Sequence, residues 1–293
     1  MNHETLYLGV DLGGTQLRLA AVTGTGRLAS DVLTVRTGPA FSPAELSRQL
    51  GELTKALHSQ AGATEFAALG IGITGVVSRG VMSQSEFLPL LNDIDLSALI
   101  APVLNCPVII ENDARCFVLA EARFGAARGV RDVCGITLGT GAGGGVMIDG
   151  RLIHGFSAQA GEVWNIPLRD RFMEYFLSGY GVVREYFAAI GRPDDGSLDS
   201  AQIAELARQG DAAAHQVWAS FGDDLYALCQ TMISLLDPEV IVIGGSLAKA
   251  RDLYLDEVKS KLGRMAARIR LAELGDAAGL IGAAALSIPA DEG

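Results

Sequence analysis

The sequence has 293 residues, a mass of 30.7 kDa, 49% hydrophobic residues and 19% charged residues. These values are typical of a globular protein of about two domains and exclude a disordered or fibrous chain. The formal net charge of -11 supplies no basic surface for nucleic acid or for an anionic membrane, so we expect neither as a partner.

The apolar stretches are too short to span a membrane. The longest uncharged runs, residues 134–148 and 277–290, fall below the roughly 20 residues that a spanning helix needs. The first residues show no basic segment followed by an apolar one, so we expect no signal peptide and a cytoplasmic protein. The four cysteines form no CxxC pair, and we expect buried thiols rather than disulfides or metal ligands.

The chain opens with a predicted hairpin and a helix. Residues 6–11 form an apolar strand that breaks at Gly13-Gly14 and resumes over residues 16–22. Ser42-Pro43-Ala44-Glu45 combines an N-cap, a proline at the first helical position and a capping-box glutamate. We therefore predict a helix from this motif to about residue 58.

Strands and helices continue to alternate along the rest of the chain. Further strands are predicted at residues 67–73 and 107–111, and a helix begins near Asp113. After residue 171 the pattern is mostly helical, with one buried strand at residues 239–243 that leads through Gly244-Gly245-Ser246 into another helix. This alternation predicts two α/β lobes with a cleft between them.

A second strand-turn-strand unit resembles the first. Strands are predicted at residues 133–136 and 146–149, joined by a glycine-rich turn at residues 139–145. Aligning Asp11-Leu12-Gly13-Gly14-Thr15 with Thr137-Leu138-Gly139-Thr140-Gly141 gives an offset of 137 minus 11, or 126 residues. This short match suggests an internal duplication.

Two G-x-G-x-x-G matches, at residues 70–75 and 139–144, do not fit a dinucleotide site. That motif needs a helix directly after its glycines, so that the helix N-terminus meets the pyrophosphate. The first match lies within and just after a strand, and the second precedes a strand-like run. A P-loop is excluded because the chain contains no G-x-x-x-x-G-K-S/T.

Three glycine turns, one of them within the match at residues 139–144, are candidates for phosphate binding, because each follows an apolar strand and can present backbone N–H groups to an anion. Their residues are Gly13, Gly14 and Thr15; Gly139, Thr140 and Gly141; and Gly244, Gly245 and Ser246. The alternative is that each turn only closes a tight connection. Asp11 favours a function, since a carboxylate at the end of an apolar strand is costly unless it meets water or a cation such as Mg²⁺.

Taken together in their order, several motifs resemble the ROK family of bacterial sugar kinases and sugar-responsive repressors. The motifs are Asp11-Leu12-Gly13-Gly14-Thr15, Glu111-Asn112-Asp113-Ala114, Leu138-Gly139-Thr140-Gly141-Ala142-Gly143-Gly144-Gly145, Ala160-Gly161-Glu162, and Leu236-Asp237-Pro238 with Gly244-Gly245. The resemblance covers nearly the whole chain.

This resemblance implies a two-lobed, actin-like (ribonuclease H-type) α/β ATPase fold, with ATP and Mg²⁺ as cofactors and a hexose in the interlobe cleft. It implies a small lobe of residues 1–112 plus a C-terminal helix at about residues 277–290, and a large lobe of residues 113–276. It also implies a homodimer.

The resemblance assigns the catalytic base to Asp113, which matches the aspartate that takes the proton from the sugar's 6-hydroxyl in the family. The alternative use of Asp113 is to cap the helix that it begins. Phosphoryl transfer needs an acceptor oxygen in line with the γ-phosphate and a base for its proton. The resemblance also gives sugar-binding residues: Gly75, Asn112, Asp113, Glu162, Asn165 and Glu174.

The sequence departs from the family beside Gly161-Glu162. Many members carry a histidine shortly after Gly-Glu and then a cysteine-rich loop that binds structural zinc, whereas Asn165 stands in the histidine's place and no Cys or His follows before Glu174. We therefore predict no structural zinc and expect burial of apolar side chains to order this segment instead. These side chains are Trp164, Ile166, Leu168 and Phe172.

The sequence does not determine which sugar is the substrate. Asn165, the segment at His154 and the Ile73-Thr74-Gly75 segment look most like those of N-acetylmannosamine kinases, but glucose, fructose and allose remain possible. His154 is expected to support its loop rather than react. The alternatives to a kinase are a non-catalytic sugar-binding protein and a regulator. We expect no DNA-binding domain, since ten residues precede Asp11 and the chain is acidic.

Overall fold

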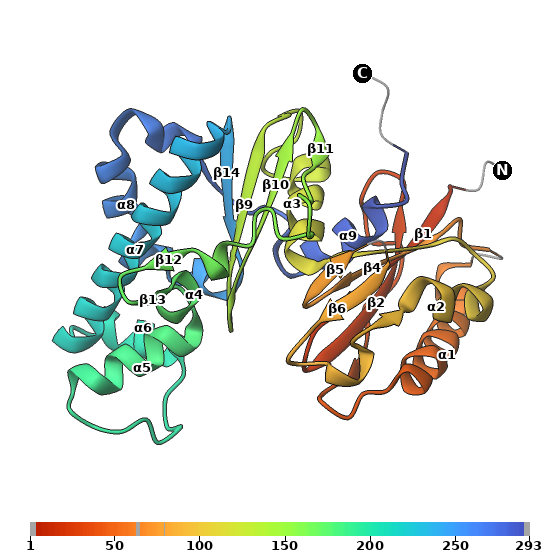
Figure 1. Ribbon diagram of the computed structural model, residues 1–293, viewed down its shortest axis with the longest axis horizontal. Helices are drawn as coiled ribbons and strands as arrows, with labels where there is room; N and C mark the ends of the chain where they lie inside the picture. Colours follow the sequence, from red (N-terminus) through yellow and green to blue (C-terminus); the bar gives the residue numbers. More distant parts are fainter. Residues whose placement is uncertain (1–3, 63–64, 79, 290–293) are drawn as a thin grey trace. The chain divides into compact units, whose positions relative to one another are not determined.

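The computed structural model describes residues 4–62, 65–78 and 80–289, and it divides the chain into two compact units (Figure 1). Unit 1 comprises Met1–Gly129, His154–Ala160 and Asp276–Gly293, and unit 2 comprises Val130–Ile153 and Gly161–Gly275. Residues 1–3, where we expect no leader, and residue 290, the last of the expected C-terminal helix, lie outside the described residues.

Unit 1 is built on a five-stranded sheet in the order β3-β2-β1-β4-β8. Strands β1, β2 and β3 are antiparallel neighbours, whereas β1, β4 and β8 run parallel. The strands are β1 (Leu6–Leu12), β2 (Gln16–Thr23), β3 (Leu33–Arg36), β4 (Leu69–Ile73) and β8 (Val108–Asn112). A smaller sheet contains β5 (Val76–Ser78), β6 (Val81–Gln84) and β7 (Ile94–Asp95).

Helices cover both faces of the unit 1 sheet (Figure 1). Alternation along β1 sends Leu8, Val10 and Leu12 into an apolar core with the helices α1 and α2 on one face. The other face carries α3 and α9. These helices are α1 (Pro43–Ala61), α2 (Leu96–Leu104), α3 (Asp113–Phe124) and α9 (Ala278–Ala285), and a 3-10 turn lies at Pro89–Leu91.

Glycine makes the close packing of α9 possible. A Cβ on Gly70 would lie 1.7 Å from the carbonyl oxygen of Ala283, and one on Gly9 would lie 2.1 Å from that of Leu280. On the helix itself, a Cβ on Gly282 would lie 1.8 Å from the carbonyl oxygen of Cys116 in α3. Backbone therefore packs directly on backbone, which explains Gly70 without any nucleotide.

Unit 2 has a five-stranded sheet in the order β11-β10-β9-β14-β15. Its strands are β9 (Val133–Leu138), β10 (Ala142–Ile148), β11 (Arg151–Leu152), β14 (Val240–Gly244) and β15 (Ile269–Leu271), and a separate two-stranded pair contains β12 (Pro167–Leu168) and β13 (Arg171–Phe172). Strands β9, β14 and β15 run parallel, and β10 is antiparallel to β9.

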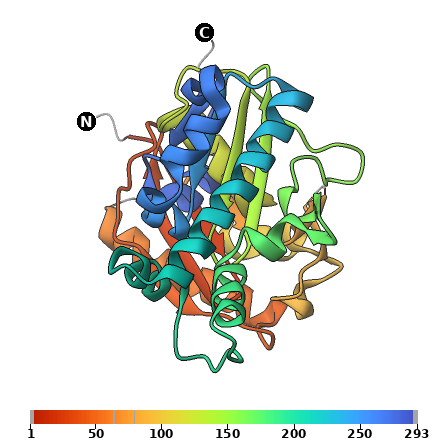
Figure 2. The same ribbon diagram turned by 90° about the vertical axis from the view of Figure 1, so that its left-hand side faces the viewer.

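The helices of unit 2 gather around α7, the long cyan helix in Figure 2. Its buried face, which includes Trp218 and Phe221, joins Ile136 and Ile241 of the sheet in one apolar core. The helices are α4 (Met173–Phe176), α5 (Gly179–Ala189), α6 (Ser200–Arg208), α7 (Ala212–Leu236) and α8 (Leu255–Leu262). Short 3-10 helices lie at Val163–Asn165, Ser246–Leu253, Gly263–Arg268 and Gly275–Ala277.

The two sheets share one topology. In each, the first three strands of the unit form an antiparallel meander, and two later strands extend the sheet in parallel from the first strand. The 126-residue offset carries β1 and β2 onto residues 132–138 and 142–149, almost the bounds of β9 and β10. The structure therefore supports the duplication that the short sequence match suggests.

Three sequence expectations are wrong in detail. The turn expected at residues 139–145 is shorter, because β10 already begins at Ala142. The helix expected after Ser246 is a 3-10 helix. Residues 113–129, 154–160 and 276, placed in the large lobe by the sequence, belong to unit 1, where α3 packs on α9.

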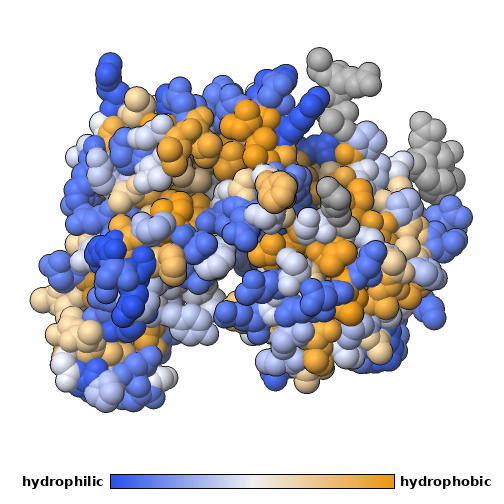
Figure 3. Space-filling view, viewed as in Figure 1, coloured by the Kyte–Doolittle hydropathy of each residue, from blue (hydrophilic) through white to orange (hydrophobic). Residues whose placement is uncertain are grey.

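The surface mixes polar and apolar side chains, and Figure 3 shows apolar residues in patches among hydrophilic ones on the face drawn. In the part of the chain that the structure describes, no helix combines the length and the hydrophobicity needed to cross a membrane.

Candidate functional site

The parallel strands of unit 1 end together at one edge of their sheet. Leu12, Ile73 and Asn112 are paired across β1, β4 and β8, so the residues that follow them leave the sheet side by side. This register brings together the unit 1 candidates, which are Asp11, Gly13, Gly14, Thr15, Gly75, Asn112 and Asp113. The carboxyl edge of parallel strands is where ligands of α/β sheets most often bind.

Asn112, and not Asp113, caps helix α3. The Asn112 Oδ1 accepts a hydrogen bond from the backbone N–H of Arg115 at 3.1 Å, and its amide nitrogen donates to the carbonyl oxygen of Gly75 at 3.1 Å. Asp113 is the first residue of the helix, and its Oδ1 accepts from the N–H of Ala114 at 2.9 Å. The N-cap alternative for Asp113 is therefore wrong, because its neighbour does that work.

Asp11 is a partly buried carboxylate on the α3/α9 face of the sheet. Its Oδ2 lies 3.5 Å from Nη1 of Arg18, its cross-strand neighbour in the hairpin. Burial raises the pKa of Asp11, and the Arg18 guanidinium opposes that rise. The pKa of the Cys116 thiol is raised by burial and further by nearby carboxylates, among them Asp11 and Asp113. Both aspartates thus lie near the same buried thiol.

Hydrogen bonds and a neighbouring aromatic ring fix the first glycine turn. The N–H of Gly13 donates to the carbonyl oxygen of Gln16 at 2.9 Å, and the Thr37 hydroxyl donates to the carbonyl oxygen of Gly13 at 2.7 Å. Phe87 lies against the turn, since a Cβ on Gly14 would approach the Cβ of Phe87 to 2.6 Å. No local pattern predicts this contact, because the two residues are 73 positions apart in the chain (87 minus 14).

The other two glycine turns lie together in unit 2. They follow β9 and β14, which are parallel neighbours, so both turns leave the same edge of the sheet. A Cβ on Gly139 would lie 3.6 Å from the Ser246 hydroxyl, and one on Gly245 would lie 2.2 Å from the carbonyl oxygen of Leu138. Gly245 also has a φ of 88°, so this turn requires glycine for both its conformation and its packing.

Glu174 reaches the turn after β9. Its Oε1 accepts a hydrogen bond from the backbone N–H of Ala142 at 3.1 Å, and a Cβ on Gly141 would come within 2.3 Å of that oxygen. The N–H of Gly179 donates to the carbonyl oxygen of Gly139 at 2.7 Å. The segment with Glu174 therefore holds the turn at residues 139–141.

Glu162 lies beside Trp164 in unit 2. The Trp164 Nε1–H donates a hydrogen bond to the Glu162 Oε2 at 2.7 Å. Asn165, which replaces the family's histidine, is exposed at the end of the same short 3-10 helix. Glu162, Asn165 and Glu174 are thus placed in unit 2, whereas Gly75, Asn112 and Asp113 are placed in unit 1.

The segment without zinc ligands is partly held by burial. Ile166 and Leu168 pack against the core of unit 2, as the sequence predicted. Phe172 does not, since its side chain is 51% exposed. Among the described residues no group of three or more His, Cys, Asp or Glu side chains could hold a metal ion. The absence of structural zinc stays a prediction.

Sequence reasoning missed a buried ionic network in unit 1. Arg115 is fully buried, pairs with Glu111 Oε1 at 3.1 Å and donates to the carbonyl oxygen of Ala158 at 2.6 Å. The other oxygen of Glu111 lies 2.5 Å from His154 Nε2. This bond agrees with the supporting role predicted for His154.

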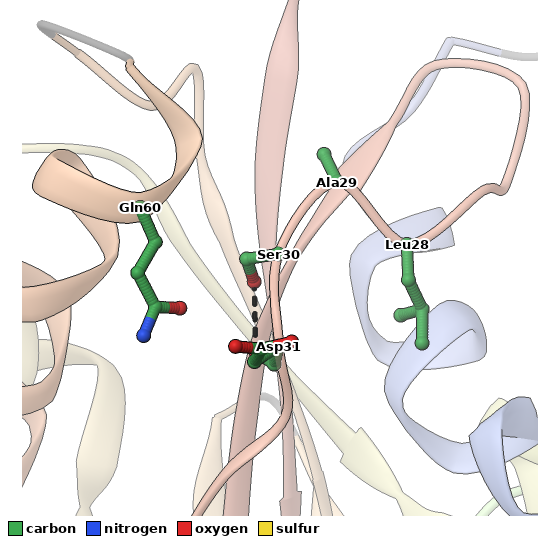
Figure 4. A pocket seen from close by; sticks show the side chains of 5 residues that line it. All are labelled: Leu28, Ala29, Ser30, Asp31 and Gln60. Carbon is green, nitrogen blue, oxygen red and sulfur yellow. Dashed lines mark hydrogen bonds between the residues drawn. The ribbon is translucent and has the colours of Figure 1, made fainter.

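A cavity of about 450 Å³ lies away from these residues (Figure 4). It is lined by Leu28, Ala29, Ser30, Asp31 and Gln60. The first four follow β2, whose end pairs with the beginning of β1, so the cavity is at the opposite end of the hairpin from the glycine turn. The Ser30 hydroxyl donates within the lining to the Asp31 carbonyl oxygen, and the cavity has no part in the candidate site.

Comparison with known proteins identifies one family over nearly the whole chain. A profile of the ROK family matches residues 7–289. The N-acetylgalactosamine kinase of Shewanella sp. (strain ANA-3) is 31% identical to this chain over 311 residues, which cover 98% of each protein.

Solved structures agree with this result. The ROK hexokinase from Thermus thermophilus matches with a TM-score of 0.83 at 28% identity, covering 96% of this chain and 97% of that one. The ROK family glucokinase from Streptomyces griseus, solved in complex with glucose and AMPPNP, matches with a TM-score of 0.79 at 28% identity, covering 96% and 98%. The expected actin-like ATPase fold is confirmed.

Proposed function

The chain belongs to the ROK family, and on that premise we propose that it transfers the γ-phosphate of ATP to the 6-hydroxyl of a hexose or an N-acylhexosamine, with Asp113 as the general base. The observation that carries this proposal is the arrangement at the start of α3. Asn112 supplies the helix cap, and the Asp113 carboxylate, whose Oδ1 accepts from the N–H of Ala114, lies at the strand edge where Asp11 and the first glycine turn also lie.

The proposed roles follow the chemistry of each group. The glycine turns of both units offer backbone N–H groups to phosphate oxygens. Glu162 and Glu174 supply carboxylate acceptors, and Asn112 supplies an amide, for the hydroxyls of the sugar. Asp113 accepts the proton that leaves the attacking hydroxyl, and such a positioned base contributes about 10² to 10⁴-fold in rate.

The residues present also fit Mg²⁺. Asp11 offers a partly desolvated carboxylate whose Oδ2 lies 3.5 Å from the cationic Nη1 of Arg18. Mg²⁺ is usually held by one or two carboxylates together with water and substrate phosphates, so a site without three protein ligands suits it. When bound, this ion would neutralise charge on the phosphates. Asp11 would hold it.

A coupled assay of ADP release tests the proposal. The sugar panel contains N-acetylmannosamine, N-acetylgalactosamine, N-acetylglucosamine, glucose, fructose and allose, with ATP and Mg²⁺. We expect sugar-dependent ADP release with at least one of them. Calorimetric binding of a sugar without ADP release would instead support the non-catalytic alternative. The implied homodimer is a separate prediction, which light scattering at several protein concentrations tests.

A further inference from the structure

We propose that Trp164 is a positioning residue that fixes the carboxylate of Glu162 and thereby determines which sugars the site accepts. This inference rests on the proposed function, in which Glu162 binds a sugar hydroxyl. The chain departs from its family directly after Gly161-Glu162. In this proposal the segment Val163-Trp164-Asn165, which stands at that departure, positions the Glu162 carboxylate through the indole of Trp164.

The backbone on either side of Glu162 is held on strand β10. Gly161 has a φ of 82°, and a Cβ there would lie 3.0 Å from Cα of Gly145. Val163 is 1% exposed, and its Cγ1 would be only 2.6 Å from a Cβ on Gly144. Contacts this close leave the main chain at residue 162 little room to shift.

The side chain of Glu162 is oriented by Trp164. The bond from Trp164 Nε1 to Glu162 Oε2 is 2.7 Å long, which is at the short end for an N–H donor and suits a charged acceptor. An indole nitrogen only donates, so this partner can hold an acceptor oxygen and nothing else. The 3-10 turn at Val163–Asn165 keeps residues 162 and 164 at the spacing that this bond needs.

A fixed carboxylate discriminates between sugars better than a freely rotating one. A carboxylate offers about four acceptor positions, and the indole bond uses one of them. Hexose epimers differ in where a hydroxyl points, and a glutamate with free rotation can follow either direction. A glutamate held by Trp164 cannot, so sugars whose hydroxyl points elsewhere lose a directional hydrogen bond.

Trp164→Phe is the direct test, because it keeps an aromatic ring and removes the N–H. We expect kcat/KM for the preferred sugar to fall by about 10-fold, as for the loss of one bond to a charged group, while the poorest sugars of the panel change by less than about 3-fold and the KM for ATP is unchanged. An equal fall for every sugar, or no fall, would overturn the proposal.

Trp218→Phe is the matched control. Trp218 is the other of the two tryptophans in the sequence, and its Nε1 has no hydrogen-bond partner among the described residues, so the same chemical change removes no such bond. We expect the sugar preference of this variant to equal that of the wild type. In the background of Glu162→Ala, Trp164→Phe should have no further effect on sugar preference; a full additional effect would show that Trp164 does not act through Glu162.

Fluorescence gives a readout that does not depend on turnover or on the folding of a Trp164 variant. In Trp218→Phe, Trp164 is the only tryptophan, and sugar titration should change its emission with the same concentration dependence as KM. Unchanged emission at saturating sugar counts against the proposal. If the wild type phosphorylates no sugar of the panel, the proposed function fails; if it is active and the Trp164 tests fail, only this inference is lost.

Discussion

At the scale of single residues, the cap of α3 and the proposed general base are neighbouring side chains, Asn112 and Asp113. Because Asn112 caps α3, replacing Asp113 by asparagine should leave the helix intact. We expect Asp113→Asn to lower kcat by about 10² to 10⁴-fold and to leave sugar affinity within about 3-fold of the wild type. Steady-state kinetics and calorimetry measure the two quantities separately.

Asp95→Asn is the control for this substitution. Asp95 caps α2, where its Oδ1 accepts from the N–H of Ala98 at 2.9 Å, and asparagine caps a helix equally well. The control should keep wild-type turnover. Turnover near that of the wild type in Asp113→Asn would remove Asp113 from the reaction.

Asp11 couples stability to pH. Its folded-state pKa is raised by burial above its ordinary value of 3.8, so the folded protein binds this proton more tightly than the unfolded chain. The stability that the protonated form contributes is complete below 3.8 and is lost as pH rises through the folded pKa. Asparagine does not ionise, so Asp11→Asn avoids the loss of stability that ionisation of Asp11 causes, and the variant should unfold at a higher Tm than the wild type at pH 7. It should also lose Mg²⁺-dependent activity.

Thermal unfolding between pH 4 and pH 8 checks the sign. The difference in Tm between Asp11→Asn and the wild type should increase as pH rises. Asp31→Asn, at an exposed aspartate in the same unit, should show no such trend. A variant that is less stable than the wild type at pH 7 would mean that the pair with Arg18 outweighs the burial of Asp11.

At the scale of elements, the α9 contacts depend on bare backbone. We expect Gly70→Ala to destabilise the protein by about 3 kcal/mol or more, because the new Cβ would meet the Ala283 carbonyl oxygen and neither strand nor helix can move aside cheaply. Chemical denaturation measures the change. Gly24→Ala is the control, since a Cβ there has nothing within 4 Å and should alter stability by less than about 0.5 kcal/mol.

The Arg115 network predicts a second stability effect. Arg115→Ala leaves Glu111 in a buried site with one cationic partner fewer, and the loss of one member of a buried pair costs about 3–5 kcal/mol. Arg48→Ala removes an exposed arginine that pairs with Glu45 and Glu52, and it should cost less than about 1 kcal/mol. If Arg115→Ala and Arg48→Ala lower the denaturant midpoint equally, the buried pair of Arg115 with Glu111 stabilises the fold no more than a surface ion pair does.

Much of the element pattern was predictable, and its errors have physical reasons. Ser42 caps α1 as the capping signal predicts, and the apolar runs at β1, β4, β8 and β14 became strands. The turn after β9 was overestimated because glycine is depleted in strands generally, whereas Gly144 in β10 is required by the chain that crosses it at Gly161. The helix α3 was placed in the wrong unit because its neighbour α9 is far along the chain.

The candidate site was predictable where one local motif holds it and not where packing does. The turn at Gly13 and Gly14 can be found in a short stretch of sequence, whereas the cap of α3, considered for Asp113, is one residue earlier at Asn112. The contact of Phe87 with Gly14 and the bond between Trp164 and Glu162 depend on the three-dimensional arrangement of each unit. The pairing of Arg18 with Asp11 could be predicted from the sequence, since a hairpin that closes at Gly13-Gly14 places the two residues opposite each other.

At the scale of the whole molecule, the repeated sheet topology places glycine turns at the carboxyl edge of each unit's sheet. The first strands, β1 and β9, end in corresponding turns that are 126 residues apart. In the aligned motifs Leu12 matches Leu138 and Gly13 matches Gly139, and the sheet topology extends this relation beyond the turns. In the proposed function, each of these turns offers backbone N–H groups to phosphate oxygens.

Nucleotide binding should therefore depend on both units. Thr15 in unit 1 and Thr140 in unit 2 are exposed, so Thr15→Ala and Thr140→Ala should leave the Tm without ligand unchanged. With Mg²⁺ and AMPPNP in excess, the ligand stabilises the protein by RT ln(1 + [L]/Kd). Each variant should lose about 1 kcal/mol of that gain, because each removes one hydroxyl hydrogen bond to the nucleotide.

The two losses should add in the double variant, because substitutions at separate sites with no shared partners have independent effects. Thr34→Ala, at an exposed threonine of β3, should lose nothing. If only one of the two turns affects the AMPPNP-induced shift in Tm, the nucleotide uses one copy of the repeat and the other serves the fold alone.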